Sequence, residues 1–328
     1  MLPGLRRLNR YERRIMRIPA KSRHARIRQV GFSRRTKDGF RFPLYALEFG
    51  KAAALRRGPA VLTAGVHGLE TIGIHVVLDF LESALDKKSP DYMADLAGGD
   101  LGLVCMPIVN PGGVVLKRRS NPAGTDLMRN SGVDGESPLP FFGGHALTPR
   151  LPYFRGRTLE PESRALMRFL RACLTTTNSA GNGTNGKPCV IPVLDVHSGF
   201  GIGTQVWWPY AGKKEASPDD ALFRELAERL RDELGHGRYH FGPQNADYRV
   251  NGDLWDRIYD AHRLERTSDG GGNALLPFTL EIGTWKDVRE SPKRLFDRRK
   301  LFNPNGKHKK IVRTSHRAFL RDFVRLAV

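Results

Sequence analysis

Two histidines and one carboxylate occupy positions where metal-assisted hydrolysis could take place. His67 and Glu70 are three residues apart, and a turn can place two ligands with this spacing on one metal ion. His197 is remote in the sequence but also follows an apolar run. Imidazole and carboxylate groups suit a borderline metal such as zinc, and three protein ligands leave a fourth position for water. Because zinc lowers the pKa of that water to about 7, these residues predict a source of hydroxide at neutral pH.

A further carboxylate, Glu281, interrupts the apolar run at residues 276–283. Burying a charged group costs free energy unless the group is paired or functional. Placed beside a metal-bound water, Glu281 would be a general base. The structural alternatives are that Glu281 faces solvent and that His67 and Glu70 merely begin a helix, since a match of this length arises easily by chance.

The elements expected around these residues place the three candidate ligands at the ends of strands and Glu281 inside a last apolar strand at residues 276–283. Residues 61–66 predict a buried strand that ends at His67 and is followed by a helix to about residue 85. Residues 190–196 predict a second strand, which ends at His197. In open α/β sheets, ligands bind in the crevice outside the carboxyl ends of the strands. We therefore expect the candidate ligands to meet there.

Other segments of the chain alternate between strand and helix patterns. The alternation at residues 25–50, with Lys37-Asp38-Gly39 as its turn, predicts a β-hairpin. A loop from 111 to about 158 is long enough to be functional. This order predicts a three-layer α/β domain with a mostly parallel central sheet. Further strands are expected at 100–110 and 205–210, helices at 159–173 and 218–234, and a flexible connection at 175–187.

The chain carries a strong positive charge, with 54 Lys and Arg against 34 Asp and Glu, a net +20. Such a charge attracts acidic partners over long range, so an acidic peptide or a cell-wall substrate is among those expected. The basic residues are spread through the sequence without a nucleic-acid motif. We therefore expect a solvated basic surface and no nucleic-acid partner.

The ends of the chain and its cysteines bear on location. Residues 1–21 are basic without the apolar core of a signal peptide, and no apolar run approaches about twenty residues, so no membrane span is expected. Cys105, Cys173 and Cys189 are widely spaced in apolar surroundings and resemble buried thiols. These features favour a cytoplasmic protein. We expect a basic helical arm at 1–24 and a single catalytic domain at 25–328 that ends in a helix; the oligomeric state is open.

Seven short segments occur in one order between residues 25 and 283. They are His67-x-x-Glu70, Asn110-Pro111-Gly112-Gly113, Arg119, residues 124–130, 160–163 and 195–198, and Phe278-Thr279-Leu280-Glu281. Together they resemble the zinc carboxypeptidases of the M14 family, and the resemblance implies a three-layer sandwich with a mixed, mostly parallel eight-stranded sheet between helices.

The resemblance implies a role for each candidate residue. His67, Glu70 and His197 would hold one zinc ion per chain, and Glu281 would be the general base. Arg119 would polarise the scissile carbonyl and stabilise its oxyanion, and such electrostatic groups are usually the largest catalytic contribution.

Recognition of the substrate's end is also implied by the resemblance. Arg129 would hold the terminal carboxylate, for which a planar guanidinium is well suited, and Asn130 would join it. The asparagine that family members usually carry before this arginine is replaced by Met128. This replacement puts carboxylate recognition in doubt or leaves it to be supplemented by another residue, such as Arg118.

Three further residues have implied roles around the substrate. Asp126 would orient His67. Tyr248 would cover the bound substrate, with Tyr259 as the alternative. Trp255 or a neighbour would form a bulky apolar wall for the released side chain.

Three functions are therefore open. The first is a zinc metallocarboxypeptidase that cleaves a terminal or near-terminal amide. The second is a zinc amidoacid deacylase of the aspartoacylase or succinylglutamate desuccinylase type, which would act on acylated amino acids. The third is a non-catalytic basic binding protein on the same fold, although such a protein would have no reason to keep both Arg119 and Glu281.

Overall fold

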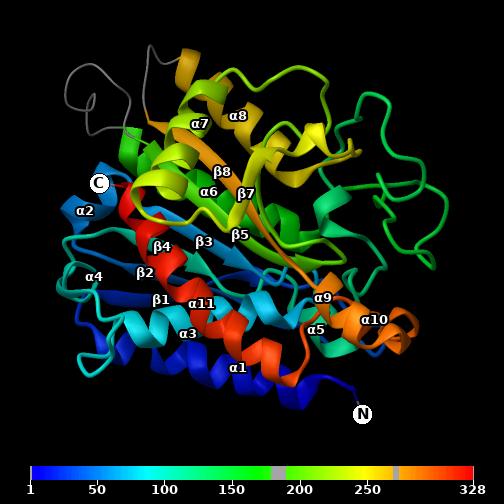
Figure 1. Ribbon diagram of the computed structural model, residues 1–328, viewed down its shortest axis with the longest axis horizontal. Helices are drawn as coiled ribbons and strands as arrows, with labels where there is room; N and C mark the ends of the chain where they lie inside the picture. Colours follow the sequence, from blue (N-terminus) through cyan, green and yellow to red (C-terminus); the bar gives the residue numbers. More distant parts are fainter. Residues whose placement is uncertain (1, 179–189, 269–272, 328) are drawn as a thin grey trace.

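The computed structural model describes residues 2–178, 190–268 and 273–327. These residues form an eight-stranded sheet with helices on both faces, in the order β1-β2-β4-β3-β5-β8-β6-β7 (Figure 1). The strands are β1 (Ala25–Phe32), β2 (Pro43–Phe49), β3 (Ala60–Ala64), β4 (Leu103–Met106), β5 (Val190–Gly199), β6 (Thr204–Trp208), β7 (Tyr239–Pro243) and β8 (Ala274–Gly283).

The sheet is mixed. Parallel ladders join β3 to β4 and β5, β5 to β8, and β6 to β7. Antiparallel ladders join β1 to β2, β2 to β4, and β6 to β8. The predicted α/β fold with a mixed, mostly parallel sheet is therefore confirmed, as is the hairpin at residues 25–50.

Helices form the two outer layers. Tyr11 of α1, Phe80 of α3, Phe223 of α7 and Phe319 of α11 belong to one buried apolar cluster, on one face of the sheet. Leu166 of α6 belongs to the cluster on the other face, together with residues of α8. The helices are α1 (Leu5–Arg17), α2 (Ala52–Arg57), α3 (Thr71–Ala84), α4 (Ala94–Gly98), α5 (Pro111–Leu116), α6 (Pro161–Asn178), α7 (Asp220–Glu228), α8 (Leu254–Ser268), α9 (Trp285–Glu290), α10 (Arg298–Leu301) and α11 (Gly306–Val324).

Some elements differ from expectation. β7 and α8 were not predicted, and the helix expected near the end of the domain is α11, which begins at Gly306. The long loop contains α5, and α6 extends into the predicted connection at 175–187, whose remainder lies outside the described residues. Cys105 is buried and Cys173 half-buried, whereas Cys189 lies outside the described part. Within that part, every helix is too short or too polar to cross a membrane.

Candidate metal centre and active site

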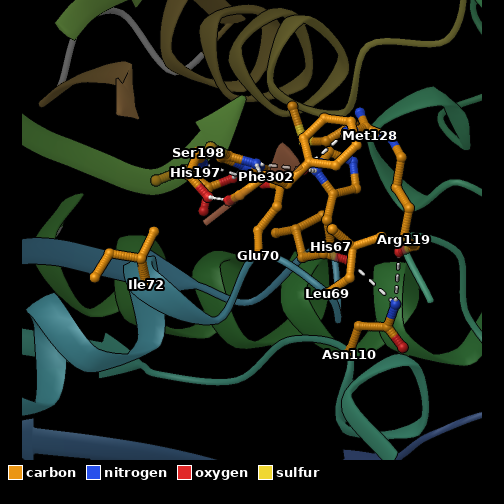
Figure 2. A network of polar contacts seen from close by, with 12 residues as sticks. His67, Leu69, Glu70, Ile72, Asn110, Arg119, Met128, His197, Ser198 and Phe302 are labelled. Carbon is orange, nitrogen blue, oxygen red and sulfur yellow. Dashed lines mark hydrogen bonds and ion pairs between the residues drawn. The ribbon is translucent and has the colours of Figure 1, made fainter. Parts of the chain in front are cut away.

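Three side chains converge at the carboxyl ends of β3 and β5. His67 and Glu70 lie in the turn between β3 and α3, and His197 lies near the end of β5 (Figure 2). The two Nδ1 atoms are 3.1 Å apart, and they lie 2.8 and 3.0 Å from the two oxygens of Glu70. The three residues are almost completely buried. Two imidazoles and one carboxylate are a common ligand set for catalytic zinc, so these donors fit the metal.

The outward-facing nitrogens of both histidines are held by carboxylates. His67 Nε2 lies 3.0 Å from Asp126 Oδ1, and His197 Nε2 lies 2.7 Å from Asp195 Oδ2. Such carboxylates fix the ring orientation and leave the other nitrogen for the metal. Asp126 therefore lies where the resemblance placed it. Asp195 was not identified as a partner of His197, although an aspartate inside an otherwise apolar strand was a signal for it.

Burial and neighbouring charges set the protonation of these groups. Burial raises the pKa of Glu70, but His67 and His197 outweigh burial and hold this pKa below its ordinary value. Burial opposes a charge on His197, whereas Asp195 and Glu70 raise its pKa well above the ordinary value. A metal must compete with that proton, because a histidine binds metal as the neutral imidazole.

Asn110 connects the turn that carries His67 to the segment that carries Arg119. Its Oδ1 accepts a hydrogen bond from Gly113 N and caps α5. Its Nδ2 donates to the carbonyl oxygens of Val66 and Arg119 at 3.2 and 3.4 Å (Figure 2). The first residues of the expected loop thus form a helix, because proline is favoured at the first helical position and asparagine at the cap.

Two further contacts fix the start of α3. A Cβ on Gly68 would lie 2.1 Å from the carbonyl carbon of Gly113, so the turn and α5 can pack this closely only with glycine. On the other side, Asn303 Nδ2 donates to Leu69 O at 2.8 Å, and its Oδ1 accepts from Ile72 N at 3.0 Å. The first two metal ligands are therefore held between α5 and the segment before α11.

The sheet register places Glu281 beside the metal site. In β8 it pairs with His197 of β5 on one side and with Gln205 of β6 on the other. A Cβ at Gly199 would lie 2.1 Å from Glu281 Oε1, so the glycine leaves space for this carboxylate. Burial and the negative charge of Glu70 raise the pKa of Glu281 to about 8. A carboxyl group with a raised pKa beside a metal site has the properties of a general base.

Arg119 is held firmly against the metal ligands. Its Nη1 pairs with Glu70 Oε1 and its Nε with Asp126 Oδ2, both at 2.8 Å. The ring of Tyr153 lies 5.1 Å from the guanidinium carbon. Burial lowers the pKa of Arg119, but Asp126 and Glu70 raise it further, so the group stays charged. It therefore offers a fixed positive charge to a bound substrate.

Arg129 supplies a second positive charge, but its neighbour Asn130 does not face the substrate. The Nε of Arg129 is buried without a hydrogen-bond partner in the described part of the chain. The Nδ2 of Asn130 donates to the carbonyls of Arg155 and Thr158, and its Oδ1 accepts from Glu160 N. The side-chain amide of Asn130 is therefore used in fixing the surrounding loop, which contradicts the prediction that this amide binds substrate.

A cavity of about 500 Å³ contains the candidate catalytic groups. Its walls come from the ends of β5 and β8, from β6, from the loop around residues 139–153, and from residues 295–302. The residues in it that sequence analysis had singled out are His67, Arg119, Arg129, Tyr248 and Glu281.

Tyr248 rather than Tyr259 faces the cavity. The Tyr248 ring lies 6.1 Å from that of Trp207 in an edge-to-face arrangement. Tyr259 is buried in α8, where its hydroxyl donates to Asp219 Oδ2 at 2.8 Å. Tyr248 therefore lies where the resemblance placed it, and Tyr259 does not.

Trp255 and Arg118 do not take part in the cavity. Trp255 is buried in α8 and donates from Nε1 to Asp195 Oδ2 at 2.9 Å, so it supports the carboxylate behind His197. The prediction that Trp255 itself forms an apolar wall for the substrate is therefore wrong. Arg118 is exposed and does not line the cavity, and it cannot supplement Arg129 there.

Comparison with known proteins identifies the family. The model of the zinc carboxypeptidase family, the M14 peptidases, matches residues 37–307. Since the match covers most of the chain, this protein belongs to that family, as the order of its motifs predicted. Membership implies zinc, and His67, Glu70 and His197 form the possible metal site.

Individual relatives agree with this assignment. Carboxypeptidase SOL1 of Arabidopsis thaliana is 26% identical over 247 residues, which make up 74% of this chain and 43% of that protein. The crystal structure of thrombin activatable fibrinolysis inhibitor has a TM-score of 0.63 at 19% identity, over 98% of this chain and 76% of the other. The crystal structure of carboxypeptidase A from Helicoverpa armigera has a TM-score of 0.57 at 15% sequence identity, over 94% of this chain and 71% of the other. These structural similarities confirm the fold.

Proposed function

We propose that this protein is a zinc carboxypeptidase that hydrolyses a C-terminal or near-terminal amide bond of a peptide. The observation that carries the proposal is that Glu281, Arg119 and Arg129 line one cavity with the metal-site residue His67. Membership of the zinc carboxypeptidase family supports it. Neither alternative function has comparable support. Zinc held there would supply a Lewis acid and a water of lowered pKa.

The chemical step is assigned to two residues. Glu281 accepts the proton of the attacking water and returns it to the leaving amine, which is the work of a general base and then a general acid. Arg119 stabilises the negative charge that develops on the carbonyl oxygen. Because Glu70 and Asp126 already hold its guanidinium, little reorganisation is needed as the charge forms.

Substrate binding is assigned to Arg129 and Tyr248. The Arg129 guanidinium offers a planar fork to the terminal carboxylate without the neighbouring amide that Met128 replaces. Tyr248 lies at the same cavity and packs against the exposed parts of the bound peptide.

The cavity also favours a cationic side chain on the released residue. Asp247 lines it, and Trp207 Nε1 donates to Asp247 Oδ2 at 2.7 Å, which orients the carboxylate. Trp207 and Tyr248 line the same cavity, and aromatic faces attract cations. A related metallo-carboxypeptidase of Pseudomonas aeruginosa, 16% identical, was solved with (2-guanidinoethylmercapto)succinic acid, which carries a guanidino group. An acidic substrate stays a prediction from the net charge alone.

A peptide panel tests the proposed function. Peptides ending in Lys, Phe or Glu would be supplied with free or amidated C-termini, beside N-acyl amino acids. We expect release of single residues from the free-ended set, abolished by a chelator and restored by zinc. Equal cleavage of amidated peptides would contradict the role of Arg129, and turnover confined to N-acyl amino acids would establish the deacylase instead.

Two predictions are not tested by the structure. One is the division into an arm at 1–24 and one catalytic domain at 25–328, and the other is a cytoplasmic location. The side of α1 that carries Leu8, Tyr11 and Ile15 is buried in the shared core, which supports an arm packed on the domain.

A further inference from the structure

A second cavity, of about 570 Å³, lies at the opposite end of the sheet from the metal site. Its walls come from β1, β2, β4, α2 and α6. Pro59, one of its residues, precedes β3, whereas His67 follows β3. The two cavities share no residue. A volume of this size is typical of small-molecule sites.

The second cavity has an apolar lining. Val104 and Phe169 are almost completely buried there, and Val30, Leu55 and Ala172 complete the apolar part. An apolar lining of this kind stabilises a ligand by removing its hydrocarbon surface from water. Burial also raises the pKa of the Cys173 thiol in the wall to about 12, so that the thiol stays neutral.

Positive charge dominates the polar part of this cavity. Arg26, Arg28, Arg56 and Arg168 line it, and Glu48 is the acidic residue among them. Glu48 is already paired with Arg28 at 2.9 Å. In the described chain, the other three arginines form no ion pair. The cavity therefore has an excess of guanidinium groups beside an apolar surface.

We propose that this cavity binds a small organic anion with an apolar body, of the type of a medium-chain carboxylate. The negative charge of Glu48 repels an anion near Arg28, its ion-pair partner, and near Arg26, which lies opposite Glu48 in the β1–β2 ladder. The head group is therefore assigned to Arg56 of α2 and Arg168 of α6. Guanidinium groups bind carboxylates through paired, charge-assisted hydrogen bonds. The hydrocarbon part then covers Phe169 and its apolar neighbours.

Octanoate tests the assignment by isothermal titration calorimetry on the 328-residue chain. Octanamide, which is neutral, and propionate, which lacks the apolar body, are the matched ligands. We expect one octanoate per chain and at least about tenfold weaker binding of both controls. Absence of octanoate binding, or equal binding of octanamide, would overturn the proposal.

Variants locate the binding. The double substitution Arg56→Gln and Arg168→Gln removes two exposed charges and should weaken octanoate at least about tenfold. Arg13→Gln with Arg17→Gln on the exposed face of α1 changes the net charge equally and should leave binding unchanged. Equal weakening by both pairs would show a general charge effect and refute the site. Because binding is measured without peptide hydrolysis, the result is independent of the proposed peptidase activity.

Discussion

Glu281 is the residue on which the proposed chemistry most depends. It lies beside His197 in the sheet, and burial opposes the charged form of its carboxyl group. The pKa of about 8 arises from burial and Glu70, and a bound divalent cation counters the contribution of Glu70. The active form is the carboxylate. Activity should therefore be lost as the pH falls through the pKa that Glu281 has when the cation is bound.

Glu281→Gln should lower kcat/KM by about 10²–10⁴-fold, because the amide keeps the shape but cannot accept the proton. Zinc content should remain at one per chain, since no ligand is changed. Steady-state kinetics and metal analysis would measure both quantities. Glu233→Gln, at an exposed position after α7, is the control. Undiminished turnover in the Glu281 variant would remove it from the mechanism.

Asp195 shows how a residue outside the ligand set can decide metal affinity. It fixes His197 through Oδ2 and also accepts from Thr63 Oγ1 at 2.8 Å. Asp195→Asn should weaken zinc binding about 10–100-fold, because the imidazole loses its anionic partner. Competition with a chromogenic chelator measures the affinity, and Asp247→Asn is a control within the cavity. Unchanged affinity would show that His197 is oriented by the strand alone.

At the scale of elements, the site depends on how closely α5 packs against the turn after β3. Gly68→Ala should destabilise the fold by about 1–3 kcal/mol, because the new Cβ would overlap the backbone at Gly113. The same change should weaken zinc binding through His67. Gly306→Ala, where a Cβ meets nothing within 4 Å, should do neither. Denaturant unfolding and zinc titration test the pair, and equal stability of the two variants would contradict close packing.

The same elements show how far sequence reasoning reaches. The strands that carry His67, His197 and Glu281 were predicted because buried parallel strands are continuous apolar runs. β7 was not predicted because Tyr239–Pro243 is short, largely half-buried and ends in a proline, so it lacks the apolar pattern of a buried strand. Asn130 and Trp255 were assigned to the substrate because sequence order does not reveal which way a side chain faces. Their real partners, such as Asp195 for Trp255, are distant in the sequence.

For the whole molecule, the two terminal helices close one face of the sheet. Asp79 of α3 pairs with Arg14 of α1 and Arg313 of α11, so residues from both ends of the chain meet on one central helix (Figure 1). α11 also buries His316, whose Nδ1 is hydrogen-bonded to the Tyr239 hydroxyl at 2.7 Å. Protonation of His316 at low pH should therefore destabilise the packing of α11, in addition to the effect of acid on the active site.

Burial, aided by the charges of Arg238 and His308, lowers the pKa of His316 to about 3. A histidine with a depressed pKa stabilises the fold fully above its ordinary pKa of about 6.5, and this contribution is lost as the pH falls toward 3. At pH 5 the loss is about 2 kcal/mol. Urea unfolding at pH 7.5 and 5.0, with chelator present to exclude metal effects, should show it.

His316→Asn retains an acceptor for the Tyr239 hydroxyl but does not titrate in this range, so the gap in stability between the two pH values should shrink by about 2 kcal/mol. His240→Asn, at an exposed position in β7, should leave the gap unchanged. Some acid sensitivity should remain in the His316 variant, because burial, with Lys309 and Arg313, also lowers the pKa of His75 to about 3. If the His316 variant and the unmodified protein lose the same unfolding free energy between pH 7.5 and 5.0, protonation of His316 does not destabilise the fold. This result would indicate that α11 opens locally in acid and exposes His316 to water.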